Sequence, residues 1–272
     1  MSCASVISSA GDGARTSSLG AEHPWIAVSL YGYGGVLNDM NRHQEAIATL
    51  TRSIEIFDRW DRRDSHEADN ARSVLSQAYG AAEQYAAALA VTEQIVNRAR
   101  SRRGTESVAY ERALYSHGFY LRRADRAAEA IPLLRESLSI AQRVEPHDAA
   151  AHTTVRLALA DALCAKAPNA EGKTLAGLAL EVRKVSGVEW QLGIARSVLG
   201  YCDPDAGAFA HNENELLQAV AQVGATRGDG SPQTRDVVKR VVRFYEFWKR
   251  SASATRWRAS LQTRYRIETT AP

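Results

Sequence analysis

Pairs of small residues recur at a fixed interval along this chain, and this recurrence constrains the fold more than any other feature. The members of a pair stand 12 positions apart, and each pair begins 42 residues after the one before. The pairs are Gly34 and Ala46, Ser76 and Ala88, Gly118 and Ala130, and Ala160 and Gly172. Gly200, and then Val242 with Ala254, continue the series to a sixth unit. Such self-similarity is the signature of a repeat architecture.

Each unit is predicted to be a hairpin of two α-helices. Apolar residues flank the small anchors at the spacing of a helix, and small side chains let two helices approach closely. In the first unit we expect one helix from Pro24 to Asp39 and a second from His43 to about Trp60. A lone hairpin cannot bury its apolar stripe, so we expect the units to stack in serial order.

These features resemble the tetratricopeptide repeat (TPR). The shared pattern is a large residue before a small anchor, a short turn, and Glu-Ala at the start of the second helix, as in Glu45-Ala46 and Glu129-Ala130. The 42-residue interval is similar to that of the long-helix subclass in kinesin light chains, in C-terminal arrays of bacterial proteins and in TPR-bearing serine/threonine kinases. The resemblance covers residues 20 to 265. It implies an all-α, right-handed α-solenoid of about six TPR-like hairpins, whose first helices line a concave groove.

The solenoid is expected to occupy residues 21–266. Residues 1–20 are rich in Ser, Gly and Ala, so we expect a disordered N-terminal lead, and we expect a flexible tail over residues 267–272. Pro204 stands where the first helix of the fifth unit should finish, which predicts a broken or shortened helix. Because the chain opens on the loop before a repeat, we hypothesise that it is the detached tail of a longer array, such as one fused to a kinase.

The first helices supply the candidate binding residues, because positions near i, i+3, i+7 and i+10 share one side of a helix. Arginine offers a bidentate fork to a carboxylate, and aromatic rings offer contact area at low entropic cost. We therefore expect the groove to bind an acidic or aromatic-containing peptide. The candidates are Tyr31, Asn38, Asn70, Gln77, Arg112, Tyr115, Phe119, Arg122, Asp161 and Tyr201.

Two alternatives remain at these positions. Tyr115 or Phe119 could pack against the next unit, and the arginines could simply be solvated. If Arg112 and Arg122 do face the groove, reversing both charges is expected to weaken binding and leave the melting temperature nearly unchanged. The paired asparagines with which the subclass holds a peptide backbone are missing here, and Tyr115-Ser116 stands at their place in the third unit.

Catalytic and cofactor motifs are suggested weakly or not at all. Residues 167 to 174 fit a loose phosphate-binding loop, but Val155 to Cys164 has helical rather than strand periodicity, and Gly172 already serves as a packing anchor. No HExxH motif is present, and the set of motifs that a protein kinase requires is missing. We expect no enzymatic activity, no cofactor and no metal.

Charge and cysteine usage bear on partner and compartment. The net charge of +3 does not favour nucleic acid, which needs a dense basic stripe. Neither an 18-residue apolar run nor a signal peptide is evident, so we expect a cytoplasmic protein without a membrane segment. Cys164 and Cys202 fall near the ends of successive first helices, where they could approach each other, and we expect two small buried thiols rather than a redox pair.

The sequence thus predicts a non-enzymatic scaffold that recruits a protein or peptide. One alternative is the regulatory tail of a bacterial signalling kinase, which would select substrates or mediate self-association. An alternative from another class is an enzyme whose site lies hidden between the units.

Overall fold

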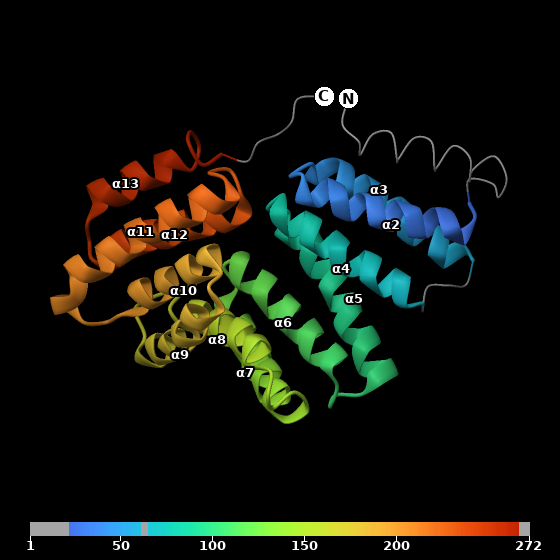
Figure 1. Ribbon diagram of the computed structural model, residues 1–272, viewed down its shortest axis with the longest axis horizontal. Helices are drawn as coiled ribbons and strands as arrows, with labels where there is room; N and C mark the ends of the chain where they lie inside the picture. Colours follow the sequence, from blue (N-terminus) through green and yellow to red (C-terminus); the bar gives the residue numbers. More distant parts are fainter. Residues whose placement is uncertain (1–21, 61–64, 267–272) are drawn as a thin grey trace. The chain divides into compact units, whose positions relative to one another are not determined.

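The computed structural model describes residues 22–60 and 65–266, and all regular secondary structure within these ranges is helical (Figure 1). The described residues up to Arg98 form one compact unit and those from Ala99 form a second. The first unit contains α2 (Pro24–Asp39), α3 (His43–Arg59), α4 (His66–Ala81) and most of α5 (Tyr85–Arg103). The second contains α6 (Val108–Arg123), α7 (Ala127–Val144), α8 (Ala149–Leu163), α9 (Ala170–Ser186), α10 (Glu189–Cys202), α11 (Phe209–Arg227), α12 (Pro232–Phe247) and α13 (Ser251–Ser260).

The helices pack as consecutive hairpins, which confirms the predicted fold class. In the first unit, α2 contacts α3, α3 contacts α4, and α2 contacts α4. In the second unit each helix from α6 to α13 contacts the next one along the chain. The first helices also touch one another, α6 with α8, α8 with α10 and α10 with α12. They therefore form one continuous layer of the second unit, which we call the first-helix wall.

The bounds of the first hairpin agree with the sequence, since α2 spans Pro24–Asp39 and α3 spans His43–Arg59. The expectations for residues 1–20 and 267–272 lie outside the described residues. Within residues 22–60 and 65–266, no helix is both long enough and apolar enough to cross a membrane.

The recurring small residues stand where two helices of a hairpin touch. A methyl group placed on Gly34 would lie 2.6 Å from Cγ of Leu50, and one on Gly118 would lie 2.8 Å from Cγ of Leu134. Both distances are far below van der Waals contact, so the leucine of the second helix occupies the space that the glycine leaves open. The regular spacing of the small residues in the sequence therefore reflects helix–helix contacts that recur along the chain.

The turns between the helices of a hairpin share one geometry. Four of them contain a non-glycine residue in the left-handed region, with φ between 55° and 60°. The residue that follows donates its N–H to a carbonyl five positions earlier, at 2.8 or 2.9 Å, which is the bond of a Schellman motif. These left-handed residues are Asn41, Glu83, Asp125 and Lys249.

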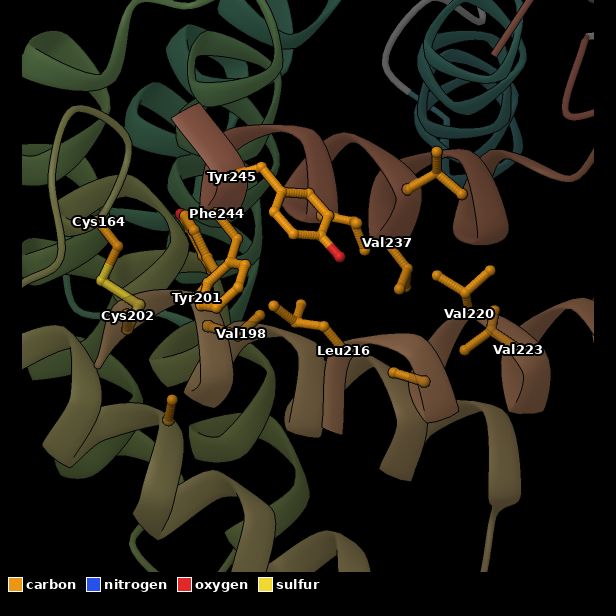
Figure 2. Close-up of a cluster of buried hydrophobic side chains, with 14 of the residues drawn as sticks. Cys164, Val198, Tyr201, Cys202, Leu216, Val220, Val223, Val237, Phe244 and Tyr245 are labelled. Atoms are coloured by element: carbon orange, nitrogen blue, oxygen red, sulfur yellow. A yellow bond between two sulfur atoms is a disulfide. The ribbon is translucent and has the colours of Figure 1, made fainter. Parts of the chain in front are cut away.

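The fifth repeat is irregular at the predicted place. α10 ends at Cys202, two residues before Pro204, and the chain continues through a short 3₁₀ turn at Ala206–Ala208 into α11. Figure 2 shows the core that follows, in which Val198 of α10, Leu216 of α11 and Phe244 of α12 gather between the three helices.

Cys164 and Cys202 form a disulfide, so the expectation of two separate thiols is wrong (Figure 2). Both cysteines are fully buried, as expected, and their Cα atoms are 5.3 Å apart. The physical reason is that α8 and α10 are neighbours in the first-helix wall and their last turns lie side by side. Because disulfides are rare in reducing compartments, this bond does not favour the expected cytoplasmic location.

Candidate functional site

One stripe of α6 faces inward across the first-helix wall. Arg112, Ser116, Phe119 and Arg123 are spaced by four, three and four residues, so they lie on the same side of the helix. The guanidinium of Arg123 forms an ion pair with Asp236 of α12, although α8 and α10 lie between these helices in the wall. The wall must therefore curve toward this stripe, which places it on the inner side of the second unit.

Arg112, Tyr115 and Phe119 form a mixed cationic and aromatic surface on this inner side, which we call the Arg112 patch. The side chain of Arg112 is 68% exposed, and its closest carboxylate contact, with Glu145, is long at 3.8 Å. The rings of Tyr115 and Phe119 lie 5.9 Å apart between centroids. The Arg123 guanidinium covers the Phe119 ring at 4.9 Å, within the range of a cation–π contact.

The Tyr115 hydroxyl stays protonated in this setting. Burial raises the pKa of Tyr115 to about 12, so the side chain is neutral at any physiological pH. A neutral phenol can both donate and accept a hydrogen bond. The patch therefore combines an exposed cation with two half-buried aromatic rings.

A buried charge network closes another part of the wall, around Asp161 of α8. Its carboxylate lies 2.8 Å from Nε of Arg240 in α12 and 3.2 Å from Nε of Arg122 in α6. Its backbone carbonyl accepts hydrogen bonds from Nε of Arg122 at 2.8 Å and from the hydroxyl of Tyr201 in α10 at 2.7 Å. One residue thus joins four first helices.

The expectation that Arg122 and Tyr201 offer exposed side chains to a ligand needs correction. Arg122 is 4% exposed and Tyr201 is fully buried, because both side chains point into the network around Asp161. Reversing the charge of Arg122 would place a second carboxylate beside Asp161. The double reversal of Arg112 and Arg122 is therefore no longer expected to leave stability unchanged.

The network fixes the ionisation of its central carboxylate. Burial on its own would raise the pKa of Asp161, but the guanidinium groups of Arg122 and Arg240 outweigh that effect and lower the pKa to about 2. Asp161 is therefore ionised at neutral pH. A buried carboxylate between two guanidinium groups is paired, which is the condition under which charges are tolerated inside proteins.

Sequence reasoning missed Asp236 and Arg240, two α12 residues that meet the inner side. Arg240 contacts a residue 79 positions away, and Asp236 contacts one 113 positions away. No local pattern marks either residue, because their partners are set by how four repeats curve together.

The other four candidates belong to the first unit. Tyr31 and Asn38 lie on α2, whereas Asn70 and Gln77 lie on α4. The side-chain oxygen of Asn38 is 2.9 Å from Nδ1 of His43, so this amide serves the hairpin turn. The Asn70 amide bonds an imidazole one turn earlier on its own helix, and Gln77 is exposed.

The stretch that fits a loose phosphate-binding loop lies between two helices, α8 and α9. Asn169 caps α9, and its side chain accepts a hydrogen bond from the N–H of Gly172 at 2.9 Å. The ammonium of Lys173 donates to Asp203 at 2.8 Å. A methyl group on Gly172 would lie 2.4 Å from Sγ of Cys164. The glycine and the lysine therefore serve packing and an ion pair, and no strand precedes the loop in the described part of this region.

Comparison with known proteins finds a match to one family model and to solved structures of one fold. Residues 25–101 match the family model described as Tetratricopeptide repeat. No curated protein sequence matches the chain significantly. The crystal structure of nearly identical TPR-like repeats, from a Podosopora anserina protein assigned as a kinesin light chain, superposes with a TM-score of 0.57 at 17% sequence identity. The superposition covers 75% of this chain and 98% of that one.

A variant of the same repeats superposes equally well, with a TM-score of 0.58, 17% sequence identity and the same coverage of both chains. At this level of identity the likeness concerns the fold. The shared feature is the serial stack of long helical hairpins.

Proposed function

Because the chain is a tetratricopeptide-repeat (TPR) protein in its fold and in its first repeats, we propose that it is a non-enzymatic scaffold that binds a peptide or protein partner. The proposed contact surface is the Arg112 patch on the inner side of the second unit. Function on a repeat fold resides in such local surfaces, since the fold itself hosts many binding roles.

The observation that carries this proposal is the exposed Arg112 guanidinium beside the Tyr115 and Phe119 rings. The neighbouring arginines, Arg122 and Arg123, are already paired with Asp161 and Asp236. Arg112 is thus the cation of this surface that a ligand can reach, and its planar fork suits a carboxylate. The partner is expected to carry an acidic side chain next to an aromatic or aliphatic one.

Selection from a random peptide library displayed on phage tests this proposal. The purified full chain should enrich peptides that contain Asp or Glu close to an aromatic residue. The variant Arg112→Glu should bind a selected peptide at least about tenfold more weakly, because a charge that attracts the ligand becomes one that repels it.

Arg103→Glu is the matched control. It makes the same charge change at an exposed position at the end of α5, the helix before the one that carries the Arg112 patch. Binding should survive in this variant, and both variants should melt like the native chain. Peptides that bind Arg112→Glu as tightly as they bind Arg103→Glu would show that the Arg112 patch is not the contact surface.

A further inference from the structure

A second candidate surface lies at the C-terminal end of the second unit, on residues outside the first-helix wall. A cavity of about 530 Å³ opens between α11 and the last helix, α13. Its floor is a stripe of α11 that contains Leu217, Val220, Ala221 and Gly224. Trp257 of α13 and Tyr265 of the turn after it form the opposite wall. This volume is typical of pockets that bind ligands.

The cavity follows from the shape of the last repeat. α13 has 10 residues, whereas the second helices α7, α9 and α11 have 18, 17 and 19. Beyond the end of α13 the chain turns back, and Tyr265 donates its N–H to the carbonyl of Ser260 at 2.9 Å. The Tyr265 ring stacks on Trp257 with centroids 6.3 Å apart. The short helix thus leaves part of α11 beside an aromatic wall.

The floor of the cavity is apolar, and most of its side chains are short. Leu217 is 37% exposed, and the residues beside it along the stripe, Ala221, Gly224 and Ala225, are small. Exposed large apolar side chains beside small residues form a depression that a bulky apolar side chain can fill. The chemistry of the floor therefore favours one leucine-sized or aromatic side chain.

The rim carries an oriented ion pair. Nε of Arg264 donates to Oδ2 of Asp229 at 2.8 Å, and the guanidinium lies 5.2 Å above the Tyr265 ring. The Arg264 side chain is 68% exposed, so the outer edge of its fork faces solvent. A methyl group on Gly224 would lie 2.9 Å from Oδ1 of Asp229, so this glycine leaves room for the carboxylate that holds Arg264.

The segment that forms the wall is strongly basic. From Arg250 to Arg266 the chain contains five arginines and no acidic residue. One of them, Arg258, pairs with Glu246 of α12, but Arg256 and Arg266 are exposed. Of these arginines, Arg264 lines the cavity and the exposed Arg266 follows Tyr265, so an occupant meets guanidinium groups at this rim, which favours an acidic partner.

We propose that this cavity binds an acidic peptide segment, with one large apolar side chain seated between α11 and Trp257 and a carboxylate on the outer edge of Arg264. The proposal is independent of the Arg112 patch, because the residues are on second helices and the last turn. A nucleic acid would need an open aromatic face for base stacking, but Tyr265 already stacks on Trp257 and the α11 floor is aliphatic, so a peptide is favoured over nucleic acid.

Fluorescence anisotropy with labelled decapeptides tests the proposal on the full chain. The peptides carry six Asp or Glu residues and a central Trp, Leu, Ser or Lys. The Trp and Leu peptides should bind at least about tenfold more tightly than the Ser and Lys peptides. Equal affinity across the four peptides would overturn the proposal, since the cavity would then contribute nothing.

Variants locate the binding site. Ala221→Phe fills the cavity from an exposed position, and Arg264→Glu reverses the charge of its rim; each should weaken the Trp peptide by at least about tenfold. Every variant is made on an Arg112→Glu parent chain, so that the Arg112 patch, which is proposed to bind a similar peptide, does not contribute. Ala221→Ser keeps the cavity open and should bind like that parent chain. Full binding by Ala221→Phe on this parent would overturn the proposal. Displacement of the Trp peptide by single-stranded RNA in all variants alike would instead assign the surface to non-specific electrostatics and also overturn it.

Discussion

At the scale of single residues, Asp161 holds more of the second unit together than any other charged group described above. Its carboxylate and carbonyl bond side chains from α6, α10 and α12. Removing one partner of a buried ion pair costs about 3–5 kcal/mol, because the remaining charge is left without compensation. Asp161→Asn should therefore lower the free energy of unfolding by about this amount, measured by urea denaturation at pH 7.

The same residue makes stability depend on pH. The pKa of Asp161 is lowered to about 2 in the folded chain, against about 3.9 in the unfolded chain. A lowered folded-state pKa contributes stability that is present above the unfolded pKa and is lost as pH falls through the folded pKa. About 2–3 kcal/mol should thus be lost between about pH 5 and pH 2. Asp161→Asn should lack this part of the pH dependence.

Asp125→Asn is the matched control for both measurements. Asp125 also pairs with an α12 arginine, Arg243, at 2.7 Å, but its side chain is 79% exposed. Exposed pairs contribute little because water screens them. An equal loss of stability in Asp125→Asn and Asp161→Asn would show that burial does not set the strength of the network.

At the scale of helices, the contact between the two members of a hairpin depends on the small anchor. In the third repeat, a methyl group on Gly118 would lie 2.8 Å from Cγ of Leu134. Adding a methyl group at such a site forces the helices apart and costs about 1–3 kcal/mol. Gly118→Ala should lower the free energy of unfolding accordingly, although alanine is the better helix former.

Gly177→Ala separates packing from helix propensity. Gly177 lies inside α9, and a methyl group there would meet nothing within 4 Å. Only the gain in helix propensity remains, so this variant should be about 0.5–1 kcal/mol more stable than the native chain. A stabilised Gly118→Ala would contradict the assignment of the anchors to helix contacts.

The helices were the part of the fold that sequence could predict, and the reason is visible at the anchors. Gly34 contacts Leu50 and Gly118 contacts Leu134, each at an offset of 16 residues. Because the same helix contact recurs along the chain, its period is visible in the sequence. No repeated pattern in the sequence marks the short α13 or the aromatic wall formed by Trp257 and Tyr265. A single departure at the end of an array has no second copy with which it can be compared.

At the scale of the second unit, side chains far apart in sequence meet because the repeats curve. The Arg112 patch was predictable in part, since one helix wheel places Arg112 and Phe119 together. The burial of Arg122 and Tyr201 was not, because it depends on Asp161 and Arg240 from two other repeats. Curvature is a sum of small rotations that no single repeat encodes in its residue pattern.

The disulfide between Cys164 and Cys202 joins two repeats of this unit, and it should stabilise the unit mainly by restricting the unfolded chain. The cysteines are 38 residues apart in sequence, for which loop-closure entropy gives roughly 4 kcal/mol. Urea denaturation with a phosphine reductant should therefore show a free energy of unfolding lower by about 2–4 kcal/mol than denaturation without it.

The double variant Cys164→Ala with Cys202→Ala controls for other effects of the reductant, because its stability should not respond to the phosphine. The chain has three cysteines, so the native protein unfolded in urea without reductant should expose one thiol to a thiol reagent. Three reactive thiols would contradict the bond. One thiol together with an unchanged stability on reduction would instead mean that the unfolded chain already keeps these two ends close together, so that the disulfide restricts it little further.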